Sequence, residues 1–477
     1  MDMTAEGLAY FGRFGVDDGL LRAALDRALS RGGDLAELYF EHRIAHEVGL
    51  EDGAVNRAFL HVSLGVGVRV VQGDQTGYAY TEELTRERIC EAAATAAIVA
   101  SGAPLPGPKA FEVRGRPDRY PVAIDFATVG IERKMPILSE INQLAFAQDA
   151  SVCKVTVGYA DSDGALFLVD STGRTAFDRQ PMARLTVGCV AERNGRRESN
   201  HHNLAGREGF EFFTPERIAK VTHEAVSRTV FCFDAGPAPA GEMPVVLAAG
   251  SAGILLHEAI GHGMEADFNR KGISVYSDKL GKRIAGPDIT IVDDGTQPHA
   301  RGAINVDDEG VEGQRTVLVQ NGILETYMHD RISAKHYGVA PTGNGRRQSF
   351  RDPPLPRMRS TYMMPGSVPP EDIIKSVKYG VFAETFTNGQ VMIGAGDFTF
   401  YIKTGYLIED GKLTRPIKDT NIIGNGPQCL ERTDLVGNDF KLDEGGWTCG
   451  KDGQSVPVSI GMPTVRVSAI TVGGVNS

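Results

Sequence analysis

The sequence predicts an α+β protein of two domains, the second of them mainly antiparallel β-sheet. Many of the 57 glycines separate runs of alternating polar and apolar residues, a pattern typical of β-hairpins rather than long helical bundles. The stretch Phe233 to Pro244 (FDAGPAPAGEMP) is rich in Pro, Gly and Ala and marks a boundary. We therefore place an N-terminal α/β-sheet domain at residues 1–236 and a C-terminal domain at residues 237–477.

The composition of the 477 residues is that of a globular protein. Hydrophobic residues make up 42% and charged residues 23%, which excludes disordered, collagen-like and coiled-coil classes. The net charge is −11 and there is no basic run, so nucleic acid is not an expected partner.

The sequence favours a cytoplasmic location. Its six cysteines include no CxxC pair and form no dense framework, which fits a reducing compartment. The first residues, MDMTAEGLAYFGRFG, lack a basic segment followed by an apolar core, so we expect no signal peptide. The longest uncharged apolar stretch, Pro244 to Leu256, is too short to span a membrane.

In the N-terminal domain we predict helices and strands in the following order. The first 33 residues are predicted as a helix that stops at Gly32–Gly33, because apolar residues fall on one of its faces. A helix opening at Thr214-Pro215 has a capping residue and a proline tolerated in its first turn. The dipeptide Asn194-Gly195 suits a type I′ hairpin. The further helices are Thr81–Ser101, Ile131–Gln148 and the one reaching Phe231; the strands are Leu35–Arg43, Leu60–Val71, Lys154–Ala160, Ala165–Val169 and Arg184–Arg193.

The C-terminal domain is predicted to open with a buried strand, Pro244–Ala249, and a helix from about Ser251 through LLHEAIGH. Segment 341–370 contains seven prolines and is predicted as a long loop that shapes a site. Short strands and hairpins are expected at Asp288–Val292, Thr316–Tyr327 around Asn321-Gly322, Phe398–Leu413 around Asp410-Gly411, and Val456–Val472.

The run His257-Glu258-Ala259-Ile260-Gly261-His262 on this helix is the strongest chemical signal. Two imidazoles can hold a zinc ion, and the carboxylate between them can act as a base for a bound water. However, residues i and i+5 lie about 140° apart on a regular α-helix. We therefore expect either a π-type bulge or an unwound turn at Gly261 and Gly263. The alternative is that His257 is a polar residue at a helix end and His262 a surface cap.

A third metal ligand must come from elsewhere in the chain. Cys449 is the best candidate, because it lies in a glycine-rich segment, 445–454, that can hold a thiolate out from the backbone, with Lys451 nearby to favour the anion. The alternative for this lone cysteine is a small buried hydrophobe. Cys429 and the pair His201–His202 are weaker rivals. The histidine pair lies in the other predicted domain, and adjacent side chains of a strand point to opposite faces.

These segments resemble the TldD branch of the TldD/PmbA family of metalloproteases. The likeness rests on HEAIGHGMEADFNR and GWTCGKDGQSVPVSIGMPTVRV and extends through DLAELYFEHRIAHEVGLEDG and GVGVRVVQGDQTGYAY, so that it covers essentially the whole chain. The resemblance implies that Zn²⁺ is held by His257, His262 and Cys449 and that Glu258 is the catalytic base.

The resemblance also implies a partner and a substrate class. TldD-type proteins pair with a homologous TldE (PmbA)-type subunit, which lacks the zinc motif, and act on unfolded or flexible polypeptides and small precursor peptides. One alternative is a regulatory or scaffolding protein of a topoisomerase or toxin system. Glu258 argues against it, because a structural zinc site needs no base. A zinc amidase that acts on small modified amides is a nearer alternative, which the sequence does not separate from a peptidase.

Two further charged runs invite a functional reading but are predicted as solvated turns. His329-Asp330-Arg331 follows a strand and is a candidate oxyanion donor. Asp307-Asp308-Glu309 is a candidate cation site, but it lacks the spaced oxygen ligands of an EF-hand loop.

Overall fold

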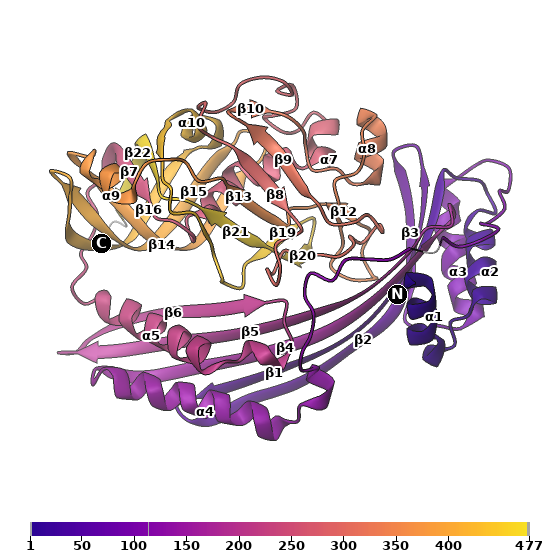
Figure 1. Cartoon of the computed structure of the whole chain (residues 1–477), viewed down its shortest axis with the longest axis horizontal. Helices are drawn as coiled ribbons and strands as arrows, with labels where there is room; N and C mark the ends of the chain where they lie inside the picture. Colours follow the sequence, from indigo (N-terminus) through magenta and orange to yellow (C-terminus); the bar gives the residue numbers. More distant parts are fainter. Residues whose placement is uncertain (1, 113, 475–477) are drawn as a thin grey trace.

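An antiparallel sheet of six strands, in the order β3-β2-β1-β4-β5-β6, forms most of the N-terminal half (Figure 1). The computed structural model describes residues 2–112 and 114–474. Figure 1 shows the sheet as a curved layer whose inner face lies toward the C-terminal half. The strands are β1 Leu35–Glu51, β2 Ala54–Gln72, β3 Gln75–Thr81, β4 Val152–Asp170, β5 Thr175–Arg193 and β6 Arg196–Gly206.

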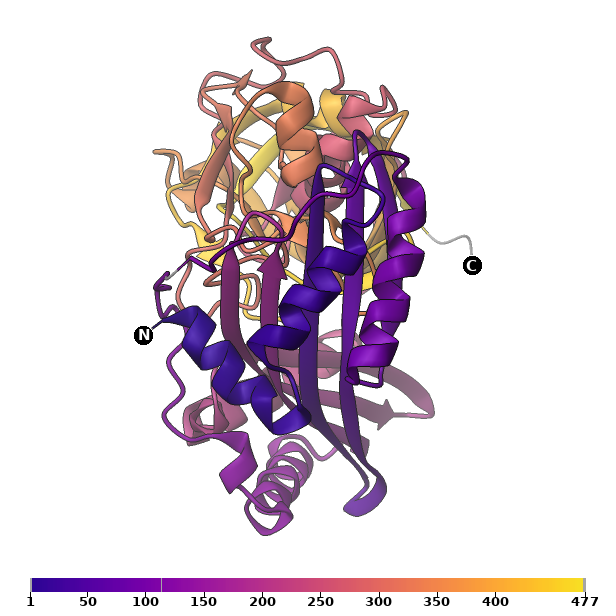
Figure 2. The same ribbon diagram turned by 90° about the vertical axis from the view of Figure 1, so that its right-hand side faces the viewer.

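Two groups of helices cover the outer face of this sheet (Figures 1 and 2). The first group packs on one end of the strands and the second on the other, and each group buries its own apolar cluster. The helices are α1 Met3–Phe11, α2 Asp18–Ala28 and α3 Arg86–Ala96 in the first group, and α4 Ile131–Gln148 and α5 Pro215–Phe231 in the second. Short 3₁₀ turns accompany them at Gly12–Phe14, Ala97–Val99, Phe126–Thr128 and Phe210–Phe212.

Several N-terminal predictions are confirmed, among them α4, α5 and the hairpin at Asn194-Gly195, whose two residues both have positive φ. The prediction of one helix over the first 33 residues is wrong. The chain leaves α1 through a 3₁₀ turn and Gly15, which has φ 85°, and a new helix begins beyond Asp17, whose side chain accepts a hydrogen bond from the Leu20 amide. Two helices therefore replace the predicted one.

The predicted strands at Leu35–Arg43 and Leu60–Val71 are too short. β1 and β2 run on to a tight turn at Asp52-Gly53, where φ is 48° and 82°. Both faces of β2 are exposed from Ala54 to Val62, so this stretch has no apolar alternation for sequence reasoning to detect.

The C-terminal half is built on two six-stranded sheets, in the orders β10-β9-β8-β13-β21-β18 and β16-β15-β14-β7-β22-β17. In the second sheet β16 also pairs with β22, so that five strands close on themselves. Among the strands of the described chain, only β7 with β14 and β13 with β21 pair in parallel. The predicted α+β class, with a mainly antiparallel second half, is confirmed.

The strands of this half are β7 Gly241–Leu247, β8 Ile291–Asp294, β9 Arg315–Gln320, β10 Ile323–Leu324, β11 Gly345–Arg346, β12 Leu355–Pro356, β13 Ser360–Met363, β14 Tyr379–Met392, β15 Asp397–Glu409, β16 Lys412–Asn425, β17 Thr433–Val436, β18 Lys441–Leu442, β19 Thr448–Lys451, β20 Gln454–Pro457, β21 Ser459–Met462 and β22 Val465–Gly474. The helices are α6 Gly253–Leu256, α7 Ala266–Arg270, α8 Arg331–Tyr337, α9 Pro370–Lys375 and α10 Gly426–Glu431. None of the helices in the described ranges is long and apolar enough to cross a membrane.

Segment 341–370 is only partly the predicted loop. It contains the short pair β11–β12 and also β13, which lies inside the first C-terminal sheet between β8 and β21. All four residues of β13 are buried. A buried strand of four residues shows no period-2 alternation of polar and apolar residues. The surrounding prolines therefore led to the prediction of a loop.

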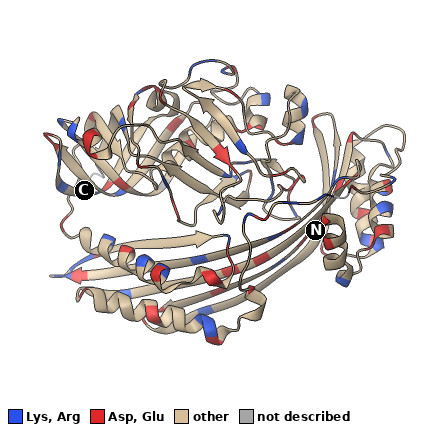
Figure 3. Cartoon of the chain, in the orientation of Figure 1, with Lys and Arg blue, Asp and Glu red and all other residues tan. Residues whose placement is uncertain are grey.

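The charged runs Asp307–Glu309 and His329–Arg331 are not the solvated turns that the sequence predicts. Apart from Arg331 their residues are buried. Arg69 of β2 explains part of this burial, because its guanidinium contacts the carboxylates of Glu37 at 2.7 Å and Glu309 at 2.6 Å. The first run therefore belongs to a buried ion network that joins the C-terminal half to the N-terminal sheet. Elsewhere, segments with Lys or Arg and segments with Asp or Glu are interspersed over the ribbon in the view of Figure 3.

Candidate metal centre

The helix that follows β7 widens where the sequence predicts that it must. α6 continues into a π-helical turn, His257–Gly261, in which the amide of His262 donates to the carbonyl of His257. This i to i+5 hydrogen bond brings the two imidazoles onto one side of the helix, with ring centroids 5.2 Å apart. Gly261 is also required for packing, because a Cβ there would lie 2.1 Å from the sulfur of Met358. The predicted widening of the turn is confirmed.

Cys449 lies beside the two histidines. It is part of β19, which pairs with β20 around the turn Asp452-Gly453, so that much of the glycine-rich segment 445–454 forms a β-hairpin. Its sulfur is 3.5 Å from Nε2 of His262. One donor atom from each of His257, His262 and Cys449 lies within 4.8 Å of the other two, and all three side chains are buried.

The three side chains fit a zinc ion. Two donors of a tetrahedral zinc site, one nitrogen and one sulfur, are about 3.6 Å apart, close to the observed separation of the Cys449 sulfur from the His262 nitrogen. Nδ1 of His257 is buried and has no hydrogen-bond partner, which is costly unless a ligand takes it. Two imidazoles and a thiolate are also the donor types that zinc prefers.

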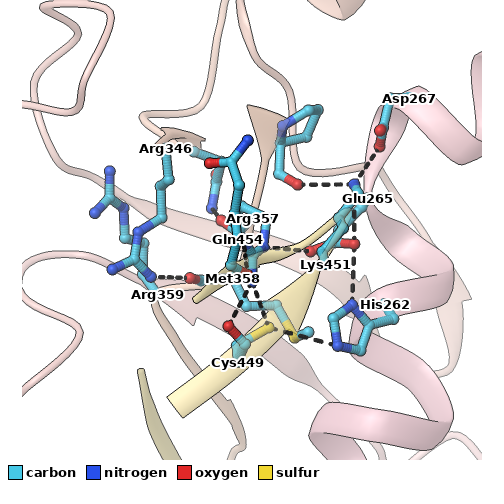
Figure 4. Close-up of polar contacts among 12 residues, drawn as sticks. His262, Glu265, Asp267, Arg346, Arg357, Met358, Arg359, Cys449, Lys451 and Gln454 are labelled. Atoms are coloured by element: carbon cyan, nitrogen blue, oxygen red, sulfur yellow. Dashed lines mark hydrogen bonds and ion pairs between the residues drawn. The ribbon is translucent and has the colours of Figure 1, made fainter. Parts of the chain in front are cut away.

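The surroundings of Cys449 favour its thiolate. Burial by itself raises the pKa of the thiol, but the imidazoles of His257 and His262 outweigh burial and lower this pKa to about 4. The guanidinium of Arg357, which is fully buried, donates from Nη2 to the carbonyl of Cys449 at 2.7 Å and to its sulfur at 3.2 Å (Figure 4). Arg357 therefore fixes the strand position of Cys449 and offsets the negative charge.

A carboxylate, itself paired with an ammonium group, orients His262 through the ring nitrogen that does not face Cys449. Glu265 Oε2 is 3.0 Å from Nδ1 of His262, which leaves Nε2 facing Cys449. Burial alone raises the pKa of Glu265, but Lys451 and His262 lower it to about 2. Lys451 Nζ lies 3.2 Å from Glu265 and donates to Asp267 at 2.7 Å (Figure 4). The prediction that Lys451 stabilises the thiolate is therefore wrong, because its ammonium group contacts these carboxylates and Arg357 contacts the sulfur.

Glu258 is the one member of the motif that reaches solvent. Its side chain is 21% exposed, and its Oε2 lies 3.9 Å from Nε2 of His262. The carboxylate thus borders the space between the three donors and the solvent without being held by another basic side chain in the described structure. That is the position that a base for a bound water requires.

The rival ligands lie elsewhere. Cys429, in α10, is buried among apolar residues, and this burial raises the pKa of its thiol to about 12. His201 and His202, in β6, line a separate cavity with Arg184 and Lys403. Among the described residues, His257, His262 and Cys449 form the only group of His, Cys, Asp and Glu side chains close enough to share a metal ion.

Sequence reasoning did not identify Glu265 or Arg357. The spacing of Glu265 could have indicated its contact with His262, because a residue three positions further along a helix lies on the same side. Arg357 carries none, since it comes from the proline-rich segment and reaches Cys449 only through the tertiary fold.

Replacing Glu265 by glutamine should lower the affinity for zinc by about 10- to 100-fold, because His262 loses the carboxylate that sets its tautomer and raises its basicity. Competition with a chelating dye measures the affinity, and Glu258→Gln, which does not touch Nδ1 of His262, is the matched control. If the Glu265 variant binds zinc as tightly as the unmodified chain, the orienting role of Glu265 is wrong.

Models of one protein family match almost the entire chain. The PmbA/TldA metallopeptidase domain 1 matches residues 36–100, the central domain matches residues 124–230, and the C-terminal domain matches residues 240–474. A metalloprotease TldD homolog of Haemophilus influenzae is 40% identical over 454 residues, which are 94% of each chain. A zinc metalloprotease TldD homolog of Saccharolobus solfataricus is 28% identical over 94% of this chain and 99% of its own.

Solved structures show the same fold at lower identity. A putative modulator of a DNA gyrase from Thermotoga maritima superposes with a TM-score of 0.77 at 22% identity, over 97% of this chain and 100% of its own. TldE from Thermococcus kodakarensis superposes with a TM-score of 0.74 at 19% identity, over 96% of this chain and 99% of its own.

Proposed function

The chain belongs to the PmbA/TldD family of metallopeptidases, and on that premise we propose that it is a zinc-dependent peptidase. His257, His262 and Cys449 would hold the metal, and Glu258 would act as the general base. The observation that carries the proposal is the π-helical turn, which brings two histidines at i and i+5 to one buried cysteine and leaves Glu258 at the solvent side.

Each residue of the site has a definite part in hydrolysis. A zinc ion held by His257, His262 and Cys449 would supply Lewis acidity, which polarises a carbonyl and makes water more acidic. Glu258 would accept a proton from the attacking water and return it to the leaving amine. Glu265 keeps Nδ1 of His262 occupied, and Arg357 keeps Cys449 in place.

The charge of the donors tunes this chemistry. Two neutral imidazoles and one thiolate leave a divalent ion with a net charge of about +1, whereas three imidazoles leave about +2. A site of this kind is a milder Lewis acid than a three-histidine site, which places more of the work of proton transfer on Glu258.

We infer that the chain acts with a homologous TldE/PmbA-type subunit on unfolded or flexible polypeptides and small precursor peptides, in the cytoplasm. The six free cysteines support a reducing compartment. The edge of β2 supports a strand-pairing contact, because in the described structure β3 pairs with it only from Val66 onward, which leaves residues 54–65 open on that side. Phe59 and Leu60 on this open edge are 61% and 64% exposed.

The isolated chain should cleave an unfolded polypeptide weakly, and the rate should rise when the homologous subunit is added. Chelation should stop the cleavage, and zinc should restore it. Replacing Phe59 and Leu60 by serine should weaken subunit binding by about tenfold or more, because an apolar contact is lost while the fold is not affected. Light scattering and peptide turnover report both effects.

Leu413→Ser is the matched control, since Leu413 is an exposed leucine of β16, which belongs to a different sheet from β2. Full activity of the chain alone, with no complex in solution, would exclude the two-subunit proposal. An absence of metal-dependent cleavage with both subunits present would exclude the peptidase.

A further inference from the structure

A cleft of about 540 Å³ lies between the inner face of the N-terminal sheet and the β19–β20 hairpin. Tyr39 of β1 and Gln180 of β5 line it from the sheet, and Thr448 and Val456 line it from the hairpin. Its most unusual feature is a set of arginines that have no acidic partner. We refer to it as the arginine cleft, defined by Arg207, Arg301, Arg346 and Arg359.

Two of these arginines have N–H groups without any acceptor. Arg207 is 2% exposed, and its guanidinium lies over the ring of Tyr120, 5.3 Å from the ring centroid. Its Nη1 makes one hydrogen bond, to Gln180 at 3.5 Å, and its Nε has no partner. Arg359 is 3% exposed, donates from Nε to the carbonyl of Gly343 at 3.1 Å, and has no partner for Nη2. A buried donor without an acceptor is costly. Other arginines of the chain also have an unpaired N–H group, but Arg207 and Arg359 line a cleft that has room for an acceptor.

The other two arginines have only neutral acceptors. Arg301 donates to the carbonyl of Trp447 at 3.0 Å and to the hydroxyl of Thr448 at 3.3 Å. Arg346 donates to the carbonyls of Met358 at 2.5 Å and Pro457 at 2.6 Å. Burial and, to a smaller extent, the neighbouring Arg184 and Arg207 together lower the pKa of Arg301 to about 9.

The carboxylates that line the cleft do not neutralise these arginines. Glu41 pairs with Arg43 at 3.2 Å, and Asp352 accepts a hydrogen bond from Ser349 at 2.9 Å. Asp308 accepts from the hydroxyl of Tyr39 at 3.1 Å and from a backbone amide at 2.9 Å. In the part of the chain that the structure describes, no carboxylate comes within ion-pair distance of the four arginines of the cleft. Asp308 acts on Arg207, Arg346 and Arg359 only from beyond ion-pair distance, and seven arginines against three carboxylates leave the lining of the cleft with a net positive charge.

We propose that the arginine cleft binds carboxylate groups of a polypeptide, which are either acidic side chains or a free C-terminus. Guanidinium groups match carboxylates in planar, bidentate geometry, and a cleft of this size accommodates a peptide segment rather than a single ion. The polypeptide nature of the ligand rests on the proposed function, whereas its negative charge rests on the arginines alone.

The cleft lies on the far side of the hairpin from the metal centre. Thr448 lines the cleft, whereas Cys449, the next residue of β19, faces His262. Figure 4 likewise shows Arg346 and Arg359 on the opposite side of Arg357 from His262. An acidic segment bound here would thus be anchored beside the metal centre without occupying it. The arginine cleft would in this way select substrates by their charge.

The test is peptide binding to the full-length Glu258→Gln chain, measured by fluorescence anisotropy. Three labelled peptides of equal length are compared: a neutral peptide with an amidated C-terminus, the same peptide with glutamates in place of glutamines, and the neutral peptide with a free C-terminus. One or both of the charged peptides should bind about tenfold or more tightly than the neutral amidated peptide, and their comparison identifies the source of the carboxylate.

Replacing Arg207 and Arg359 together by glutamine should abolish this preference. Arg351→Gln is the matched control, because Arg351 lines the same cleft but is already paired with Glu82 at 2.6 Å. Without peptide, the double variant should unfold at the same temperature as the parent chain or higher, since mutual repulsion is removed.

Equal binding of all three peptides, an unchanged preference in the double variant, or an equal loss in the Arg351 variant would overturn the proposal. A lowered unfolding temperature with unchanged peptide binding would mean a purely structural role. Because binding is the readout, a chain that binds acidic peptides but cleaves none would contradict the proposed function alone.

Discussion

Replacing Glu258 by glutamine is expected to leave zinc bound and to reduce peptide hydrolysis by about 10²- to 10⁴-fold, the usual cost of removing a general base. The geometry leads directly to this result. Glu258 is next to His257 in the chain, but its carboxylate is partly exposed and stands outside the group of three donors. Glutamine has nearly the same shape and keeps a hydrogen-bonding group, but it cannot accept the proton of a water.

Zinc content and turnover of an unfolded polypeptide are to be measured on the same sample of this variant. Glu325→Gln, at an exposed position between β10 and α8, is the matched control and should keep both. Turnover equal to that of the unmodified chain would remove Glu258 from the mechanism. Loss of zinc would instead mean that Glu258 is a ligand.

Replacing Cys449 by serine is expected to have the largest effect on the metal. A serine hydroxyl is a far poorer anionic donor than a thiolate, and the surroundings of Cys449 are built for a thiolate, with Arg357 at 3.2 Å and a pKa of about 4. The loss of zinc affinity should exceed the roughly 10- to 100-fold that removal of an outer-shell partner costs, and hydrolysis should fall with it.

Cys429→Ser provides the control for this prediction. Its thiol lies in an apolar setting that raises its pKa to about 12, so it behaves as a small hydrophobe rather than a ligand. Zinc stoichiometry of the Cys429 variant should be unchanged, apart from any loss of stability that a buried hydroxyl causes. Equal zinc content of the two serine variants would contradict the assignment of Cys449.

Local signals in the sequence were sufficient for much of the N-terminal fold. α5 has a capping threonine and proline at its start, and the turn at Asn194-Gly195 needs two residues that tolerate positive φ. The break between α1 and α2 was missed because apolar periodicity was followed, whereas the break is marked by Gly15 and by the capping residue Asp17. β13 was missed because it is short, fully buried and surrounded by prolines.

More features of the candidate site than of the surrounding fold could be predicted from the sequence. A helical angle of about 140° between His257 and His262 required a widened turn, and the structure contains one. The orienting groups could not all be predicted. Arg357 reaches Cys449 from a different part of the chain, and the pairing of Lys451 with Asp267 and Glu265 depends on where β19 meets α7.

The X-ray absorption spectrum at the zinc edge of the zinc-loaded full-length chain tests the central claim most directly, because it counts the kinds of atom that surround the metal. The account predicts one sulfur neighbour from Cys449, two imidazole nitrogens from His257 and His262, and one exchangeable oxygen. A spectrum without sulfur, or with two or more sulfurs, would contradict it.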